Sequence, residues 1–113
     1  MNLDGRYFRV ARTATLGVVS GETRLRLAQR GARVSGQYSG GSVERGCLIG
    51  WVAGDVLFFR YAQRERSGDI HGGVSVCQIR PQVTGRLVLE EHFAWDTRPG
   101  EGTNVFVESL AAS

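Results

Sequence analysis

The residue best placed to do chemistry in this sequence is Glu91, an acid within a run of alternating apolar residues. Four apolar residues share its parity along the chain: Leu87, Leu89, Phe93 and Trp95. Residues two apart point to the same face of a β-strand. A buried carboxyl group must be paired, hydrogen-bonded or protonated, because burying it as an unpaired charge costs several kcal/mol. We therefore expect Glu91 to form the polar centre of a mostly apolar interior.

Arg45 is the partner that we predict for Glu91. It shares the parity of Cys47, Ile49 and Trp51, so we expect all four on the inner face of one strand. The hydroxyls of Tyr38 and Tyr61 are expected beside the pair. Three roles for this centre stay open: a purely structural ion pair, a site that recognises a ligand, and a catalytic acid or base. The residues that we predict to contact a ligand are Tyr38, Arg45, Trp51, Phe59, Tyr61, Glu91 and Trp95.

Other chemistry has weaker support in the sequence. Asp69 and His71 share a strand face, so the carboxylate could orient the imidazole, whereas His92 has the opposite parity to Glu91 and is expected to be exposed. No G-x-S-x-G nucleophile motif occurs, and the apolar neighbours of Cys47 predict a core thiol. The cysteines and histidines lack a local chelating pair, and no phosphate-binding loop precedes a helix. We assign no catalytic residue, metal or cofactor.

Composition narrows the function classes. The chain has 113 residues, enough for one domain over 1–113, and all 14 of its basic residues are arginine. Without lysine there is no P-loop lysine and no Schiff-base or pyridoxal-phosphate site. The arginines are dispersed, so we do not expect nucleic-acid binding, although the run 58–61 could stack bases. Two isolated cysteines and the lack of a long apolar run indicate a cytoplasmic protein outside the membrane.

Strand signals bounded by turn residues recur about every ten residues and predict an all-β protein. The expected strands are Gly5–Arg12, Glu22–Gln29, Arg33–Ser39, Val43–Ala53, Val56–Gln63, Asp69–Ile79, Arg86–Trp95 and Thr103–Ser109. Short connections favour an antiparallel meander, which has no exposed edges if it closes into a barrel. We therefore predict a small, closed, up-and-down barrel of about eight strands, whose interior is just wide enough for side chains or one small ligand.

Period-two alternation also predicts which side chains face inward. The expected inner rows are Leu25 and Leu27; Val34 and Tyr38; Leu57, Phe59 and Tyr61; Ile70, Val74 and Val76; and the row that contains Glu91. The strand 43–53 is apolar on both faces, which indicates that its outer face is covered. A second subunit is the simplest cover, so we expect a homodimer.

A resemblance to known proteins supports the barrel. The opening Leu3-Asp4-Gly5-Arg6-Tyr7 resembles the L-x-G-x-W start of avidin-like and lipocalin-like barrels, with Tyr in place of Trp. Together with the segments 20–22, 38–41, 46–50, 59–61 and 91–95, the chain resembles a family of short bacterial proteins often labelled N-acetylglutamate synthase. The resemblance implies a small antiparallel barrel. An acetyl-CoA-binding turn is not found, because the nearest match, 33–38, ends in Tyr and enters a predicted strand.

The function that we predict is binding of a small organic ligand inside the barrel. The alternatives are an enzyme of the isomerase or cyclase type that uses Glu91, and an oligomeric interaction module with a filled interior. In the enzyme, Glu91 would have a raised pKa and no tight partner. A cavity of roughly 300 Å³ or more would favour ligand binding, whereas a closed apolar core would favour the interaction module.

Overall fold

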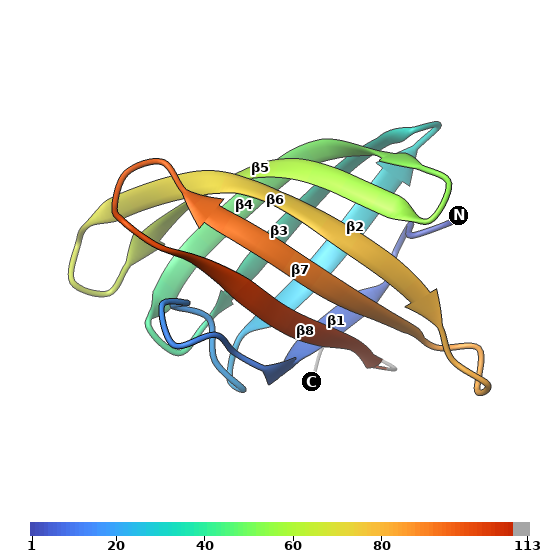
Figure 1. The fold of residues 1–113 in the computed structure, drawn as a ribbon, viewed down its shortest axis with the longest axis horizontal. Helices are drawn as coiled ribbons and strands as arrows, with labels where there is room; N and C mark the ends of the chain where they lie inside the picture. Colours follow the sequence, from blue (N-terminus) through green and yellow to red (C-terminus); the bar gives the residue numbers. More distant parts are fainter. Residues whose placement is uncertain (110–113) are drawn as a thin grey trace.

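The computed structural model describes residues 1–109, which form a closed barrel of antiparallel strands in sequential order (Figure 1). The strands are β1 (Tyr7–Arg12), β2 (Arg24–Arg30), β3 (Arg33–Gly40), β4 (Val43–Ala53), β5 (Val56–Glu65), β6 (Ile70–Pro81), β7 (Leu87–Trp95) and β8 (Glu101–Ser109). Each strand pairs with the next, and β1 also pairs with β8, which closes the sheet. The predicted up-and-down barrel is confirmed.

Tight turns explain why consecutive strands are neighbours. Gly31 connects β2 to β3 with φ of 62°, and Gly54 connects β4 to β5 with φ of 60°. Both angles lie in the left-handed region, which glycine adopts without the steric cost that a Cβ atom brings. Connections this short hold adjacent strands antiparallel and set the register between them.

The inner faces of four strands are those that alternation predicts. Leu25 and Leu27 on β2, and Val34 and Tyr38 on β3, are buried. The predicted rows on β5 and β7 are also directed inward: Leu57, Phe59, Tyr61, Leu87, Leu89, Glu91, Phe93 and Trp95. These side chains form one continuous core along the barrel axis.

The prediction for β4 is wrong. The four residues expected inside lie on the outer face and are exposed: Arg45, Cys47, Ile49 and Trp51. Gly46 and Leu48 face inward instead. A β-bulge between Val43 and Arg45 shifts the pairing with β5 by one residue, so that buried Val43 is followed by buried Gly46 rather than by Arg45. Such a slip moves every later side chain to the opposite face.

The inner face of β6 is also the reverse of the prediction. Ile70 and Val76 are exposed and Val74 is half-buried, while the inward residues are Gly73, Ser75, Cys77 and Ile79. Apart from Ile79, the inward residues are therefore smaller than the aliphatic residues Ile70, Val74 and Val76 on the outer face. A Cβ atom on Gly73 would come within 2.7 Å of the Tyr61 hydroxyl and 2.1 Å of the Ala94 carbonyl oxygen. Small residues on β6 thus make room for large inward side chains on β5 and β7.

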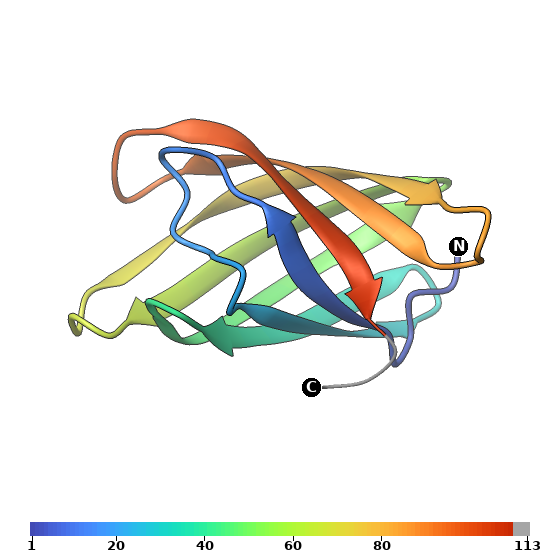
Figure 2. The same cartoon turned by 90° about the horizontal axis from the view of Figure 1, so that it is seen from below.

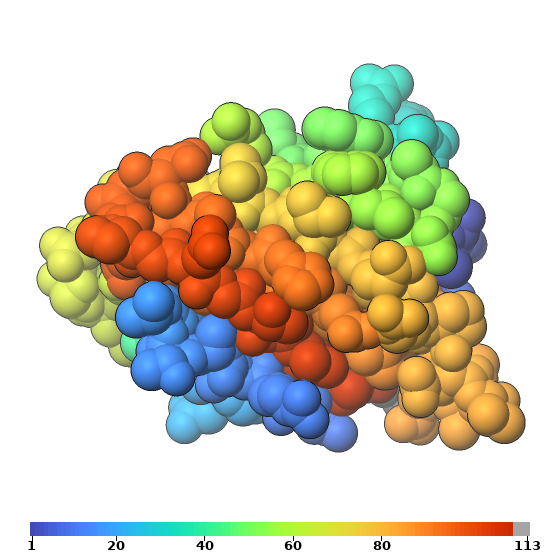
Figure 3. All heavy atoms as spheres, in the orientation of Figure 1, coloured from blue at the N-terminus to red at the C-terminus, as the bar shows by residue number. Residues whose placement is uncertain are grey.

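One end of the barrel, which we call the mouth, is formed by the connections that follow β1, β3, β5 and β7. The longest of these, residues 13–23, folds across the mouth and lies beside the β7–β8 connection (Figure 2). Hydrogen bonds to the barrel hold this segment in place: Ser42 Oγ donates to the Val18 carbonyl at 3.1 Å, Trp95 Nε1 donates to the Leu16 carbonyl at 3.2 Å, and the Ala14 N–H donates to Asn104 Oδ1 at 3.0 Å. In the space-filling view this segment packs directly against β8 (Figure 3).

Candidate functional site

Beneath the segment 13–23 lies a cavity of about 40 Å³, roughly room for three water molecules. This volume is far smaller than the roughly 300 Å³ expected of a ligand pocket. It is not a closed apolar core either, because polar side chains line it together with aromatic ones. The residues that face it from the strands are Leu25, Tyr38, Leu48, Phe59, Tyr61, Gln63, Glu91, Phe93, Trp95, Asn104 and Phe106, and Gly17, Val18 and Val19 cover it.

Glu91 lies inside the barrel, as predicted, but its hydrogen-bond partners are not the predicted ones. The residue is 6% exposed, and its Oε1 atom accepts a hydrogen bond of 2.9 Å from Asn104 Nδ2 on β8. Its Oε2 atom accepts one of 2.7 Å from Ser75 Oγ on β6. Burial raises the pKa of the Glu91 carboxyl and outweighs the opposing effect of these two hydrogen bonds and of His92. The predicted ion pair with Arg45 does not form, because the bulge on β4 turns Arg45 to the outer face.

A chain of polar contacts leads from the interior to the mouth. Tyr38 Oη donates to Gln63 Oε1 at 2.8 Å, and Gln63 Nε2 donates to Glu65 Oε2 at 2.9 Å. At the mouth, Arg98 Nη2 donates to both carboxylate oxygens of Glu65 at 2.7 Å. Burial alone would raise the pKa of Glu65, but the hydrogen bonds from Arg98 and Gln63 and the charge of Arg98 hold this pKa below its usual value.

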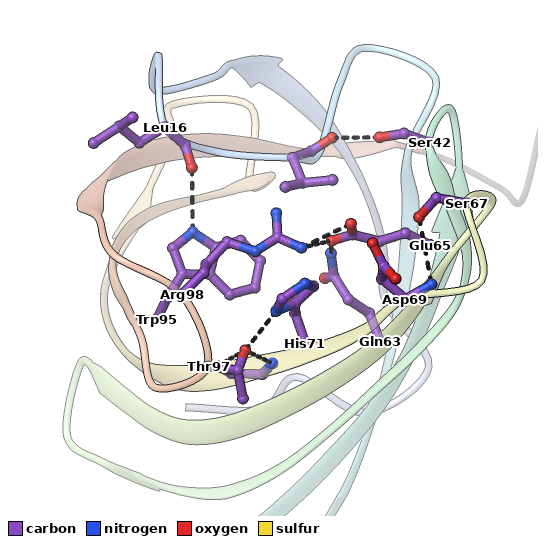
Figure 4. Close-up of polar contacts among 12 residues, drawn as sticks. Leu16, Ser42, Gln63, Glu65, Ser67, Asp69, His71, Trp95, Thr97 and Arg98 are labelled. Atoms are coloured by element: carbon purple, nitrogen blue, oxygen red, sulfur yellow. Dashed lines mark hydrogen bonds and ion pairs between the residues drawn. The ribbon is translucent and has the colours of Figure 1, made fainter.

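The Arg98 side chain lies across the mouth between Trp95 and Glu65, as the close-up shows (Figure 4). Its guanidinium carbon is 4.6 Å from the centre of the Trp95 ring system, within the range of a cation–π contact. The side chain of Arg98 is 25% exposed and that of Glu65 is 12% exposed. The ion pair and the segment 13–23 therefore cover the cavity together.

Tyr61 is the exception in this satisfied network. Its hydroxyl oxygen is buried and has no hydrogen-bond partner among the described residues. The ring packs edge-on against Trp95 at 5.3 Å and against Phe59 at 6.1 Å between ring centres. Burial and the nearby Glu91 carboxyl raise the pKa of the Tyr61 phenol, so this hydroxyl stays protonated near neutral pH. A donor and acceptor thus faces the cavity with its hydrogen bonds unmade.

Of the seven predicted ligand-contacting residues, the structure brings five together around the cavity. These are Tyr38, Phe59, Tyr61, Glu91 and Trp95. Arg45 and Trp51 lie on the outer face of β4 and do not line this cavity, which corrects the expectation that both face inward. Trp51 instead stacks on Phe58 with 5.3 Å between ring centres.

Sequence reasoning missed several polar residues of the site. Gln63 and Glu65 continue the parity of Phe59 and Tyr61 on β5, so alternation, extended past the apolar residues, would have placed both inside. Alternation does not point to Ser75 or Asn104, because more of the apolar residues in each of these strands have the opposite parity. Arg98 lies in a loop, where periodicity says nothing about direction.

The remaining candidates for acid–base or metal chemistry do not form a site. His71 Nδ1 lies 2.8 Å from Thr97 Oγ1. Asp69 immediately precedes β6, and orientation of the His71 imidazole by its carboxylate stays a prediction. His92 is exposed, as expected. Within residues 1–109, no group of three or more His, Cys, Asp or Glu side chains is placed to hold a metal ion. The same residues contain no helix long and apolar enough to cross a membrane.

Comparison with known proteins places the barrel in a family. A family model described as avidin-like protein matches residues 1–109, which covers every strand of the barrel. No curated protein and no solved structure matches the chain. The match confirms the resemblance to avidin-like barrels that the N-terminal motif indicates. With its closed eight-stranded sheet and this match over nearly its whole length, the chain belongs to the avidin-like protein family.

Proposed function

We propose that the protein binds a small organic ligand, of a few non-hydrogen atoms, in the cavity beneath the mouth of the barrel. The observation that carries this proposal is the Tyr61 hydroxyl, which is buried beside the cavity without a partner among the described residues. A buried polar group that makes no hydrogen bond costs about 1–3 kcal/mol. A ligand that hydrogen-bonds to this oxygen recovers that cost.

The lining supports binding rather than catalysis. Ligand sites combine mostly apolar walls with a few convergent polar groups, and here aromatic rings surround Tyr61, Gln63 and Glu91. For the alternative of an isomerase or cyclase, Glu91 should have a raised pKa and no tight partner. The pKa is raised, but Ser75 and Asn104 both hold the carboxyl group. An avidin-like barrel is consistent with a binding protein.

The experiment is a titration with ethanol, a neutral probe of three non-hydrogen atoms, followed by the two tryptophan indole N–H signals in NMR spectra. Trp95 lines the cavity and Trp51 lies on the outer face, so Trp51 reports any general solvent effect. We expect ethanol to shift the Trp95 signal in a saturable way and to leave Trp51 unmoved. The Tyr61→Phe variant should bind about fivefold more weakly, the equivalent of one hydrogen bond of about 1 kcal/mol. Equal shifts at both tryptophans, or full affinity without the hydroxyl, would contradict the proposal.

We also propose that the outer face of β4, β5 and β6 pairs with a second copy of the chain. Trp51, Phe58 and Val76 lie directly opposite one another across these strands, with Ile49 and Val74 in the next row. Ile49 is 70% exposed, Trp51 55% and Val76 42%. A contiguous apolar surface of this kind is typical of protein–protein contacts.

The charges around this apolar face favour a second copy over a polyanion. Arg60 pairs with Asp96, and Arg80 pairs with Glu90, so both signs surround the apolar residues and two of the arginines are already neutralised. A like-charged edge would repel an identical partner, whereas a mixed edge can pair with itself. Sedimentation equilibrium should give a dimer for the native chain and a monomer for Trp51→Glu. A native monomer at tens of micromolar protein would contradict this proposal.

The two free cysteines, Cys47 and Cys77, agree with the reducing, cytoplasmic location that we propose.

A further inference from the structure

The cavity combines a mostly aromatic lining with one acidic side chain. Six aromatic side chains face it from four strands: Tyr38, Phe59, Tyr61, Phe93, Trp95 and Phe106. Neighbouring rings meet edge to face, with centres 5.3 Å apart for Tyr61 and Trp95 and 6.0 Å apart for Phe93 and Trp95. The faces of aromatic rings carry partial negative charge and attract cations, most strongly where water is excluded.

The acid among these rings has no counter-ion in the described part of the chain. Glu91 is the one acidic residue of the cavity lining, and neither arginine nor histidine is part of that lining. The sequence contains no lysine. None of the four ion pairs within residues 1–109 involves Glu91. Arg98, which lies at the mouth above the cavity, has both oxygens of Glu65 as its partners.

The hydrogen bonds around Glu91 show that its carboxyl oxygens act as acceptors. Asn104 Oδ1 accepts a hydrogen bond of 3.0 Å from the Ala14 backbone N–H, and this fixes the orientation of the Asn104 amide. The Nδ2 group of Asn104 therefore donates to Glu91 Oε1. Ser75 Oγ, 2.7 Å from Oε2, donates in the same direction. Two donors aimed at one carboxyl group stabilise its ionised form, so the site is arranged for a carboxylate that still lacks a positive partner.

We infer, on the basis of the proposed function, that the ligand's buried end is a small organic cation, such as a primary ammonium group, paired with Glu91 and surrounded by the aromatic rings. An ammonium group donates three hydrogen bonds. Glu91 can accept one and the free Tyr61 oxygen another, since a phenolic oxygen accepts as well as donates. One ammonium group would then supply both the counter-ion for Glu91 and the hydrogen-bond partner for Tyr61.

The other titratable groups that face Glu91 do not compete for this role. Tyr38 from β3, Tyr61 from β5 and Cys77 from β6 all have pKa values raised by burial and by the Glu91 carboxyl itself, so each is neutral near pH 7. His92, the neighbour of Glu91 on β7, lies on the outer face with Nδ1 3.1 Å from Thr103 Oγ1. Glu91 is therefore the group among these whose ionised form places a negative charge in the cavity, and a bound cation favours that form.

The test compares ethylammonium with ethanol, which has the same number of non-hydrogen atoms and no charge. Each is titrated at pH 7 and constant ionic strength, and the Trp95 indole signal is followed with Trp51 as the internal control. We expect ethylammonium to bind about tenfold more tightly than ethanol. Glu91→Gln should abolish this preference, so that ethylammonium no longer binds more tightly than ethanol. Glu65→Gln, which removes the acid at the mouth, is the matched control and should retain the preference.

The outcomes separate this inference from the proposed function. If both probes bind with equal affinity to the native protein, the ligand site stands and the preference for a cation is refuted. If neither probe moves the Trp95 signal, both are refuted. Loss of the preference in Glu65→Gln rather than in Glu91→Gln would place the cation at the mouth and overturn the inference. Should Glu91→Gln fail to fold, the native protein suffices: ethylammonium affinity must rise as the pH rises through the titration of Glu91, while ethanol affinity stays constant.

Discussion

Two buried tyrosines in the same cavity are expected to respond in opposite ways to removal of the hydroxyl group. Tyr38 Oη donates to Gln63 Oε1 at 2.8 Å, whereas the Tyr61 hydroxyl has no partner among the described residues. Their side chains are equally buried, at 8% and 9% exposure, so the cavity left by the lost oxygen is similar. The phenylalanine substitutions at these positions therefore compare a satisfied with an unsatisfied hydroxyl at nearly constant packing.

The magnitudes follow from the hydrogen-bond arrangement. Tyr38→Phe removes one hydrogen bond and leaves the Gln63 oxygen buried without its donor, which should lower the free energy of unfolding by about 1–3 kcal/mol. Tyr61→Phe removes a buried hydroxyl that makes no hydrogen bond to the described residues, so it should raise this free energy by about 1 kcal/mol. The unfolding entropy of a chain of 113 residues is about 0.24 kcal/mol/K, so 1 kcal/mol corresponds to about 4 °C in Tm.

The assay is urea unfolding followed by circular dichroism, with Tm values measured on the same variants in buffer without small organic solutes. We expect Tyr38→Phe to unfold at lower urea concentration than the native protein and Tyr61→Phe at higher concentration, with similar m-values. If Tyr61→Phe loses as much stability as Tyr38→Phe, its hydroxyl is satisfied within the folded chain, and the argument for a ligand at this position fails.

Three further predictions follow from the same contacts. Stability should fall as the pH rises from about 4.3, the ordinary glutamate value, toward the raised native pKa of Glu91, because in this range the unfolded chain releases a proton that the folded chain keeps. Glu91→Gln should remove this decline in urea midpoints measured from pH 3 to 8. An unchanged slope in the variant would contradict this prediction. Glu65, whose pKa is lowered, contributes stability above about pH 4.3 that is lost as the pH falls through its native pKa, so Glu65→Gln should weaken the protein at pH 7 and flatten the acid side of the same profile. Gly46→Ala should cost about 1–3 kcal/mol, because its Cβ would lie 2.3 Å from the Tyr38 ring, whereas Gly21→Ala, with nothing within 4 Å, should leave the urea midpoint within experimental error.

The fold was predictable because its signals are local. Turn residues recur between short alternating segments, and glycines such as Gly31 stand where the backbone needs a positive φ. The inner faces of β2, β3, β5 and β7 could be identified for the same reason, since most of the large apolar residues of each of these strands share one parity. Where a strand is apolar on both sides, as β4 is, alternation gives no preference, and the bulge between Val43 and Arg45 decided the matter.

The site was predictable in part. Glu91 could be placed inside, because it alternates with Leu89 and Phe93 in a row of large apolar residues that favours burial. Its partners could not be read in the same way. Ser75 and Asn104 are polar residues on neighbouring strands, and their approach to Glu91 depends on the register of β6 and β8 with β7, which is a property of the closed sheet.

The amino-acid sequence by itself thus determined the strands, their order and the burial of one carboxyl group, because period-two alternation and turn chemistry act over a few residues. The tertiary structure decided what that carboxyl group meets. Closure of the sheet places two hydrogen-bond donors against Glu91, leaves the Tyr61 hydroxyl without a partner among residues 1–109, and brings Arg98 from a loop to Glu65 across the mouth. Such contacts join residues that are distant along the chain, and only barrel curvature and register fix the distances between them.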